Sequence, residues 1–197
     1  MHVVTIGRTH VQDAVPLTFG QEVAGWTTML EKCQHIIEAS EKYLLGLAIG
    51  GTAVGTGLNA PKDFGTRVSA EIAKETGLPF VSEENKFYAL TGRDDFVFAH
   101  GALEALAMDC MKIADDLRLL AGGPRAGLGE LTIPANEPGS SIMPGKVNPV
   151  MAEVLDQTCY QIIGNDMAIS LGVENGQFEL NVMEPVMAFN LFHSMQY

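Results

Sequence analysis

The chain has 197 residues, with 24 acidic against 12 basic side chains and a formal net charge of −12 at pH 7. This acidity argues against a nucleic-acid partner, because phosphate binding needs a basic face. Hydrophobic residues make up 47% of the chain, enough for one domain with a large core, and no apolar run is long enough to span a membrane. The start has no basic region followed by an apolar one, so we expect no signal peptide and a cytoplasmic protein.

Three widely spaced cysteines, Cys33, Cys110 and Cys159, are best explained as reduced thiols. The chain contains no CxxC or HxxxH pattern, whereas a metal site needs ligands close together. We therefore expect no metal and no organic cofactor. A glycine-rich run at 50–57 lacks the Gly-Lys-Ser/Thr ending of a phosphate-binding loop, and we interpret it as a tight loop between helices.

Long proline-free stretches with apolar residues at helical spacing predict an all-α fold, a bundle of long helices. Residues 1–14 are expected to be extended or looped, with Pro16 starting the first helix. The predicted helices, in chain order, are 17–47, 63–76, 87–120 with a possible break near Gly92, 150–171, and one from 184 to about 195.

The predicted long helices imply association between copies of the chain. A helix of thirty residues spans about 45 Å. A compact domain with as many residues as this chain has a radius of gyration of only about 16 Å. Their apolar stripes would stay uncovered in a monomer. We therefore expect a homo-oligomer.

Residues 139–149 read Gly-Ser-Ser-Ile-Met-Pro-Gly-Lys-Val-Asn-Pro and are the main candidate for a functional site. The prolines and glycines exclude a regular helix or strand. Ser140 and Ser141 supply hydroxyls, Lys146 a positive charge, and Asn148 a paired donor and acceptor. Together these groups could hold a carboxylate and remove a proton from the carbon beside it.

This stretch resembles the signature loop of the fumarase/aspartase superfamily. Residues 7–18, beginning Gly-Arg-Thr-His, resemble the family's second conserved region, and residues 164–166 and 178–182 resemble the helix that follows its loop. The likeness runs over essentially the whole chain. It implies the family's central helical domain, which assembles as a homotetramer around a twenty-helix core. Family members are more than twice this long, so residues 1–197 are expected to be a single central domain without its N- and C-terminal domains.

The resemblance also implies a chemistry, the elimination of ammonia or water next to a carboxylate-bearing carbon. The carbanion so formed needs cations and hydrogen-bond donors where its charge develops. By resemblance, Ser140 is the catalytic base, and Lys146 and Asn148 bind the carboxylate and its enolate form. Ser141 is expected only to shape the loop.

The substrate's other carboxylate is expected to contact Thr9 and His10, and Glu153 matches the family's acidic partner of that histidine. Because the chain is acidic overall, its few cations must act locally in a pocket. The candidates are Arg8, His10 and Lys146.

Two substrates compete, L-aspartate with release of ammonia and L-malate with release of water, both giving fumarate. The blocks at 149–153 and 176–185 look more like aspartases. The blocks at 85–87, 129–130 and 136–138 look like fumarases. Since the blocks nearest the chemistry favour aspartase, we predict an aspartate ammonia-lyase, with class II fumarase as the alternative.

An alternative hypothesis is that the chain is a structural protein rather than an enzyme, an inactive helical core that forms oligomers. Family sites draw on three subunits and on a threonine- and serine-rich region that would lie before Gly7, and this chain has no such region. The 197-residue chain alone is therefore expected not to turn over substrate.

Overall fold

The computed structural model describes residues 2–197 and confirms the all-α class. Its helices are α1 (Phe19–Glu41), α2 (Phe64–Thr76), α3 (Lys86–Thr91), α4 (Asp94–Leu120), α5 (Val150–Glu174) and α6 (Glu184–Gln196), with a 3-10 turn at Lys42–Leu44. Its strands are β1 (Val4–Thr9), β2 (Gln12–Thr18), β3 (Gly46–Leu47) and β4 (Val81–Ser82). Each strand belongs to a two-stranded sheet, β1 with β2 and β3 with β4.

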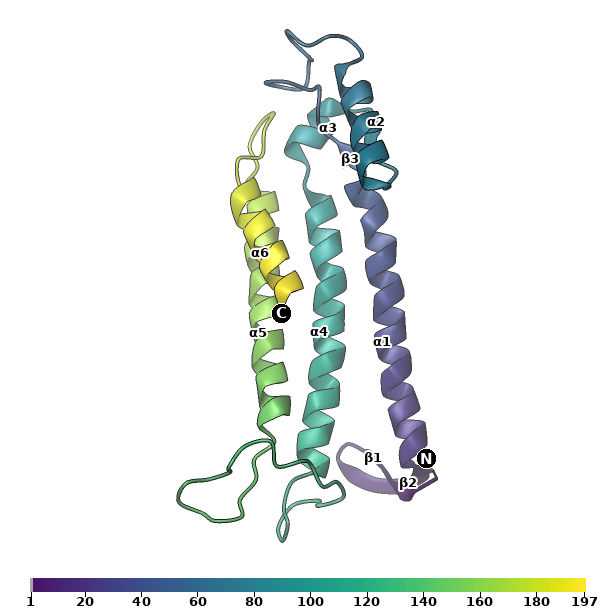
Figure 1. Ribbon diagram of the computed structural model, residues 1–197, viewed down its shortest axis with the longest axis vertical. Helices are drawn as coiled ribbons and strands as arrows, with labels where there is room; N and C mark the ends of the chain where they lie inside the picture. The colour runs from purple at the N-terminus through teal and green to yellow at the C-terminus, as the bar shows by residue number, and fades with distance from the viewer. Residues whose placement is uncertain (1) are drawn as a thin grey trace. The chain divides into compact units, whose positions relative to one another are not determined.

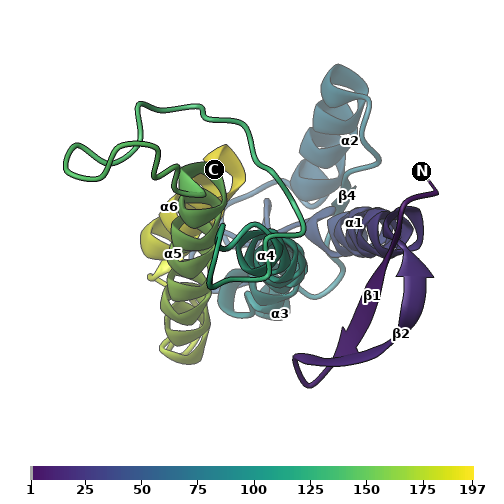
Figure 2. The same ribbon diagram turned by 90° about the horizontal axis from the view of Figure 1, so that it is seen from below.

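The chain divides into two compact units. One comprises residues up to 35 together with 106–159, and the other comprises 36–105 together with 160–197. The first unit holds every predicted site residue, in the β1–β2 hairpin, in the long loop between α4 and α5, and in the first turns of α5. Figures 1 and 2 show the hairpin, drawn in purple at the start of α1, and the loop that joins α4 to α5.

The first helix starts later and ends earlier than predicted, since α1 ends at Glu41 and Gly46–Leu47 form β3. Pro16 lies inside β2, opposite Ile6, and α1 begins only at Phe19. Thr18 caps the helix, because the Gln21 amide N–H donates to its Oγ1 (3.2 Å) and the Gln21 side chain accepts from the Thr18 amide (2.9 Å). This reciprocal pair is a capping box. Its Thr-x-x-Gln pattern was present in the sequence and outweighs the proline as a start signal.

Local end signals placed the other helices well. α2 ends at Gly77, whose φ of 74° is left-handed and whose N–H donates to the Ala73 carbonyl. The break near Gly92 is real, since α3 ends at Thr91 and α4 begins at Asp94. α5 begins at Val150, directly after Pro149, as predicted.

The core of the second unit is small. Ile169, Met187 and Leu191 are buried together on α5 and α6, and partly buried side chains surround them: Phe96, Val97, Leu103, Val173 and Met183. The buried hydrophobic residues of the first unit are Trp26, Cys33, Ala107, Ala114, Leu120 and Cys159, and four of these six are alanine or cysteine. Across residues 2–197, no helix has the length and apolarity needed to cross a membrane.

Candidate active site

The turn of the β1–β2 hairpin carries two of the predicted site residues. Thr9 pairs with Gln12, so His10 and Val11 form a two-residue turn, with φ values of 55° and 61°. Both angles are left-handed, a conformation that hairpin turns usually give to Asn or Gly. For the β-branched Val11 it is a clear outlier. Backbone strain of this kind persists at functional sites, and the strained turn leaves Thr9 and His10 exposed.

Arg8, just before this turn, is already engaged by acidic side chains. Its guanidinium contacts Glu130 and donates from Nε to Asp13 Oδ1 at 3.1 Å. The hydrogen bond to Glu130, with the charges of Glu130 and Asp13, raises the pKa of Arg8, although desolvation opposes the shift. The charge of Arg8, one of the three candidate cations together with His10 and Lys146, is therefore already paired within the chain.

The signature loop at 139–149 is folded back on itself. The amide of Ser140 donates to the Lys146 carbonyl (3.1 Å), and the amide of Lys146 donates to the Met143 carbonyl (3.2 Å). Gly139 has a φ of 79°, and a Cβ there would lie 2.6 Å from the Lys146 carbonyl oxygen. Only glycine fits this position. The Ser140 hydroxyl accepts a long hydrogen bond from the Ile142 amide, 3.4 Å.

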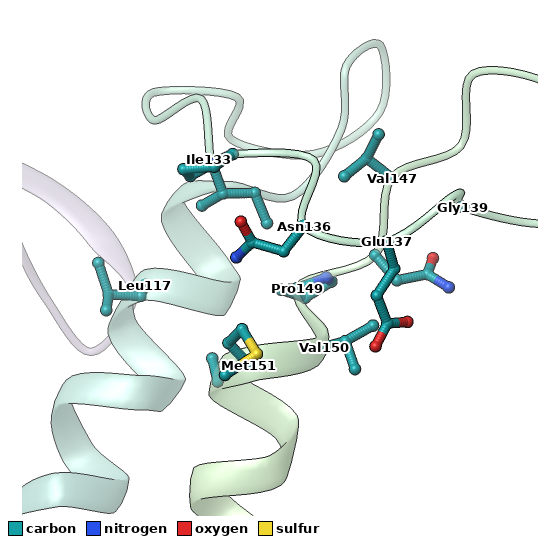
Figure 3. Close-up of a pocket in the computed structure, with 12 residues that line it drawn as sticks. Leu117, Ile133, Asn136, Glu137, Gly139, Val147, Pro149, Val150 and Met151 are labelled. Carbon is teal, nitrogen blue, oxygen red and sulfur yellow. The ribbon is translucent and has the colours of Figure 1, made fainter.

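A cavity of about 190 Å³ lies where this loop meets α4 and α5. Its wall is mainly apolar, with the polar side chains of Asn136, Glu137 and Asn148 added to it. Figure 3 shows Asn136 near Met151 and Glu137 beside Val150. The apolar lining residues are Leu117, Ile133, Pro134, Val147, Pro149, Val150, Met151 and Ala152. Asn148 is thus placed in a pocket wall, as a substrate ligand requires.

Glu153 lies in the first turn of α5, where the helix dipole favours a negative charge. The nearby Arg118 donates to Asp156 (2.7 Å) and to Asp115 (3.0 Å). Desolvation lowers the pKa of Arg118, but the charges of Asp156, Asp115 and Glu153 outweigh it and raise this pKa overall. Arg118 therefore holds the end of α4 against the start of α5, beneath the loop.

The predicted residues form two separate groups. The hairpin group consists of Thr9 and His10, and the loop group consists of Ser140, Lys146, Asn148 and Glu153. Among residues 2–197, no hydrogen bond or ion pair joins one group to the other, and neither Thr9 nor His10 lines the cavity beside the loop. A complete site, with groups for both substrate carboxylates, is not assembled by the described chain. Nor does this part of the chain gather three metal-binding side chains in one place.

The second unit contains a Ser–His–Asp arrangement that the sequence did not signal. His100 contacts Asp166 Oδ1 through Nδ1 and Ser194 Oγ through Nε2, both at 2.8 Å. Asn165 also donates to Ser194 Oγ, at 2.9 Å. His100 is fully buried and Ser194 is 6% exposed, so no substrate can reach them. We assign this network to packing among α4, α5 and α6.

Comparisons with known proteins agree on the family. A family model described as lyase matches residues 1–164. Fumarate hydratase class II of Listeria monocytogenes is 57% identical over 196 residues, which cover 100% of this chain and 43% of that protein. The enzyme of the same name from Halalkalibacterium halodurans is 60% identical over 192 residues, 98% of this chain and 42% of that protein.

Solved structures agree as well. The class II fumarase of Schistosoma mansoni superposes with a TM-score of 0.95 at 42% identity, covering 98% of this chain and 44% of that one. A fumarate lyase:delta crystallin from Brucella melitensis, bound to cobalt, gives a TM-score of 0.94 at 42% identity, covering 98% and 42%.

These relatives overturn one prediction. Proteins 55–60% identical to this chain are named fumarate hydratase, so the choice of aspartate ammonia-lyase is wrong. It rested on the blocks at 149–153 and 176–185. The chain spans less than half the length of the curated relatives that it matches. Its family model, its close relatives and its structural neighbours nevertheless agree, and the chain belongs to the lyase family within the fumarase/aspartase superfamily.

Proposed function

We propose that this chain is the central helical part of a class II fumarate hydratase, which adds water reversibly to fumarate to give L-malate. One observation carries the proposal, the 57% identity over 196 residues to a protein of that name. That alignment covers 100% of this chain, and so it includes the hairpin and the signature loop together. The substrates would be small dicarboxylates, fumarate and L-malate.

In the direction from malate to fumarate, Ser140 would take a proton from the carbon beside a carboxylate. The electron pair left behind spreads into that carboxylate, which becomes a doubly charged enolate form. Lys146 and Asn148 would stabilise this charge as it develops. The bond to the hydroxyl oxygen on the neighbouring carbon then breaks, the hydroxyl takes up a proton and leaves as water, and the double bond of fumarate forms. The proton taken by Ser140 passes to solvent, so that the overall reaction neither gains nor loses a proton. Hydration follows the same steps in reverse.

A serine is a weak base unless its ionised form is stabilised. The loop supplies one such interaction, because the Ile142 amide already donates to Ser140 Oγ at 3.4 Å. Lys146 is brought back toward Ser140 by the hydrogen bond between their backbones. A shortening of the Ile142 bond in the substrate complex would strengthen this support.

The two separate groups of site residues support a site built from several copies of the chain. We propose that Thr9 and His10 of one copy bind the second carboxylate beside the loop of another copy, with Glu153 as the acidic partner of the histidine. This arrangement would explain why the strained hairpin turn presents both side chains outward. It also requires the enzyme to be an oligomer, for which we propose a homotetramer.

The accessible surface supports this assembly. It measures 12948 Å², whereas a compact monomer of 21.1 kDa exposes about 9,000 Å². Two separate compact bodies of half that mass would expose about 11,000 Å² together. The excess includes large apolar side chains on α1, α4, α5 and α6: Val23, Leu30, Met108, Leu119, Met151, Val154, Tyr160, Met167, Leu171, Phe189 and Phe192. Burying such surface against other copies favours association.

The thiols support a proposal about the location of the enzyme. Cys33, Cys110 and Cys159 are all free. We propose a reducing, cytoplasmic location, where such thiols stay reduced.

An assay on the protein at the full length its gene encodes tests the function. Purified enzyme supplied with L-malate should form fumarate, followed by its ultraviolet absorbance, and should form L-malate from fumarate. With L-aspartate it should release no ammonia. Fumarate formed from aspartate but not from malate would refute the proposal.

A further inference from the structure

Glu130 lies in the long loop ten positions before Ser140, and both of its carboxylate oxygens are occupied. Oε1 contacts the guanidinium of Arg8, and Oε2 accepts from the hydroxyl of Thr5 at 3.0 Å. The Glu130 side chain is only 25% exposed. Its amide N–H donates to the carbonyl of Leu120, the last residue of α4, at 2.8 Å. Glu130 therefore ties strand β1 to the end of α4 and to the loop that follows.

Arg8 provides the contact with Glu130 from the hairpin. Its side chain is 17% exposed and bridges Glu130 and Asp13. The strand register shifts between Ile6, which pairs with Pro16, and Arg8, which pairs with Asp13. Such a bulge re-aims the side chains beside it. Arg8 also directly precedes Thr9 and His10, so its position sets where the turn of the hairpin lies.

We propose that Arg8 and Glu130 are positioning residues that hold the hairpin turn, with Thr9 and His10, in a fixed place relative to the start of the signature loop. This inference rests on the proposed function and concerns the same site. Arg8 would not contact substrate at all. Its charge would be used within the chain, on Glu130, and its removal would displace groups that do touch substrate.

The charge states suit this role. The hydrogen bond from Arg8 lowers the pKa of Glu130, which therefore stays ionised near neutral pH. A charge-assisted contact between a guanidinium and a carboxylate is directional as well as strong, because the planar donors match the carboxylate oxygens. The contact joins residues 122 positions apart in the chain. It therefore restrains two segments that nothing in the local sequence holds together.

The kinetic test compares Arg8→Gln, Glu130→Gln and the double variant in the full-length enzyme. If the pair positions the site, each single change lowers kcat by roughly ten- to a hundredfold, since displacements of about 1 Å have effects of that size. The double variant should be no worse than either single one. If Arg8 instead binds substrate, Arg8→Gln alone raises KM, and Glu130→Gln leaves KM and kcat nearly unchanged. That second result would overturn the proposal.

Two further variants keep the test decisive. Thr5→Val removes only the hydroxyl bond to Glu130 and should lower kcat in the same direction by a smaller factor, even if the glutamine variants fold poorly. Arg67→Gln breaks an exposed ion pair with Asp63, 3.9 Å long, outside the site, and should leave kcat and KM unchanged. Normal kcat in both Thr5→Val and Glu130→Gln would contradict the positioning role.

Hydrogen exchange provides a readout that needs no activity. In Glu130→Gln, the amides of Glu130 and Leu131, which both donate to Leu120, should exchange faster, as should amides of the hairpin. Unchanged exchange in both segments would refute the positioning role of Arg8 and Glu130, whatever reaction the enzyme catalyses. Faster exchange in a protein that does not convert malate would support the positioning role and refute the proposed function instead.

Discussion

In the proposed mechanism Ser140 is the base. We predict that Ser140→Ala in the full-length enzyme lowers kcat by at least about a hundredfold while KM changes little, because a base acts in the transition state and adds little to ground-state binding. Ser141→Ala is the matched control, since that hydroxyl is expected only to shape the loop. Near-normal turnover of Ser140→Ala would assign the base to another group, with His10 the next to test.

The buried thiols give a prediction for alkaline pH. Desolvation raises the pKa of Cys33 to about 11 and that of Cys159 to about 11, from an ordinary value of 9.0. Because the folded state binds these protons more tightly, the stabilisation is complete below pH 9 and is lost as the pH rises through 11. The free energy of unfolding, measured by urea titration, should fall across this range. The fall should be smaller in Cys159→Ala, and an equal fall would contradict the assignment.

At the scale of elements, the start of α1 depends on its capping box. We predict that Thr18→Ala lowers the free energy of unfolding by about 1 kcal/mol, the usual value of such a cap. Thermal or urea unfolding would measure the loss. Thr27→Ala, which removes a hydroxyl bonded within the helix to the Val23 carbonyl, is a control and should cost less. If the two variants lost the same stability, the capping box would not define the helix start.

Element boundaries were predictable from sequence where the signals are local. Gly77 and Pro149 act on the backbone within one helical turn, so α2 and α5 were placed to within a few residues. Pro16 misled because proline suits the first turn of a helix and also an edge strand. The Thr18–Gln21 capping box and the pairing of Pro16 with Ile6 across the hairpin together favour the strand.

For the whole molecule we predict association. Light scattering of the full-length protein at micromolar concentration should report a tetramer, because its apolar helix faces need covering. A polar change on one such face, Met167→Glu, should lower the mass toward smaller species, since Met167 is 63% exposed in the single chain. A monomer in the unmodified protein would contradict both the assembly and a site shared between copies.

The proposed reaction also needs no metal. We predict that dialysis of the full-length enzyme against a chelator leaves malate dehydration unchanged, because Ser140, Lys146 and Asn148 supply the base and the charge stabilisation. Buffer dialysed in parallel is the control. Loss of activity that added magnesium restores would contradict the prediction.

The sequence by itself determined the helical class and most helix ends, because periodicity and capping residues act over a few positions, and its loop motif supplied the candidate site residues as a prediction. It could not show that Arg8 is bound to Glu130, or that His100 meets Ser194 94 positions away. Those pairings depend on which side chains the fold brings together in space. Only the tertiary structure showed that Thr9 and His10 stand apart from Ser140, Lys146 and Asn148, because separation, like contact, is a property of the folded chain.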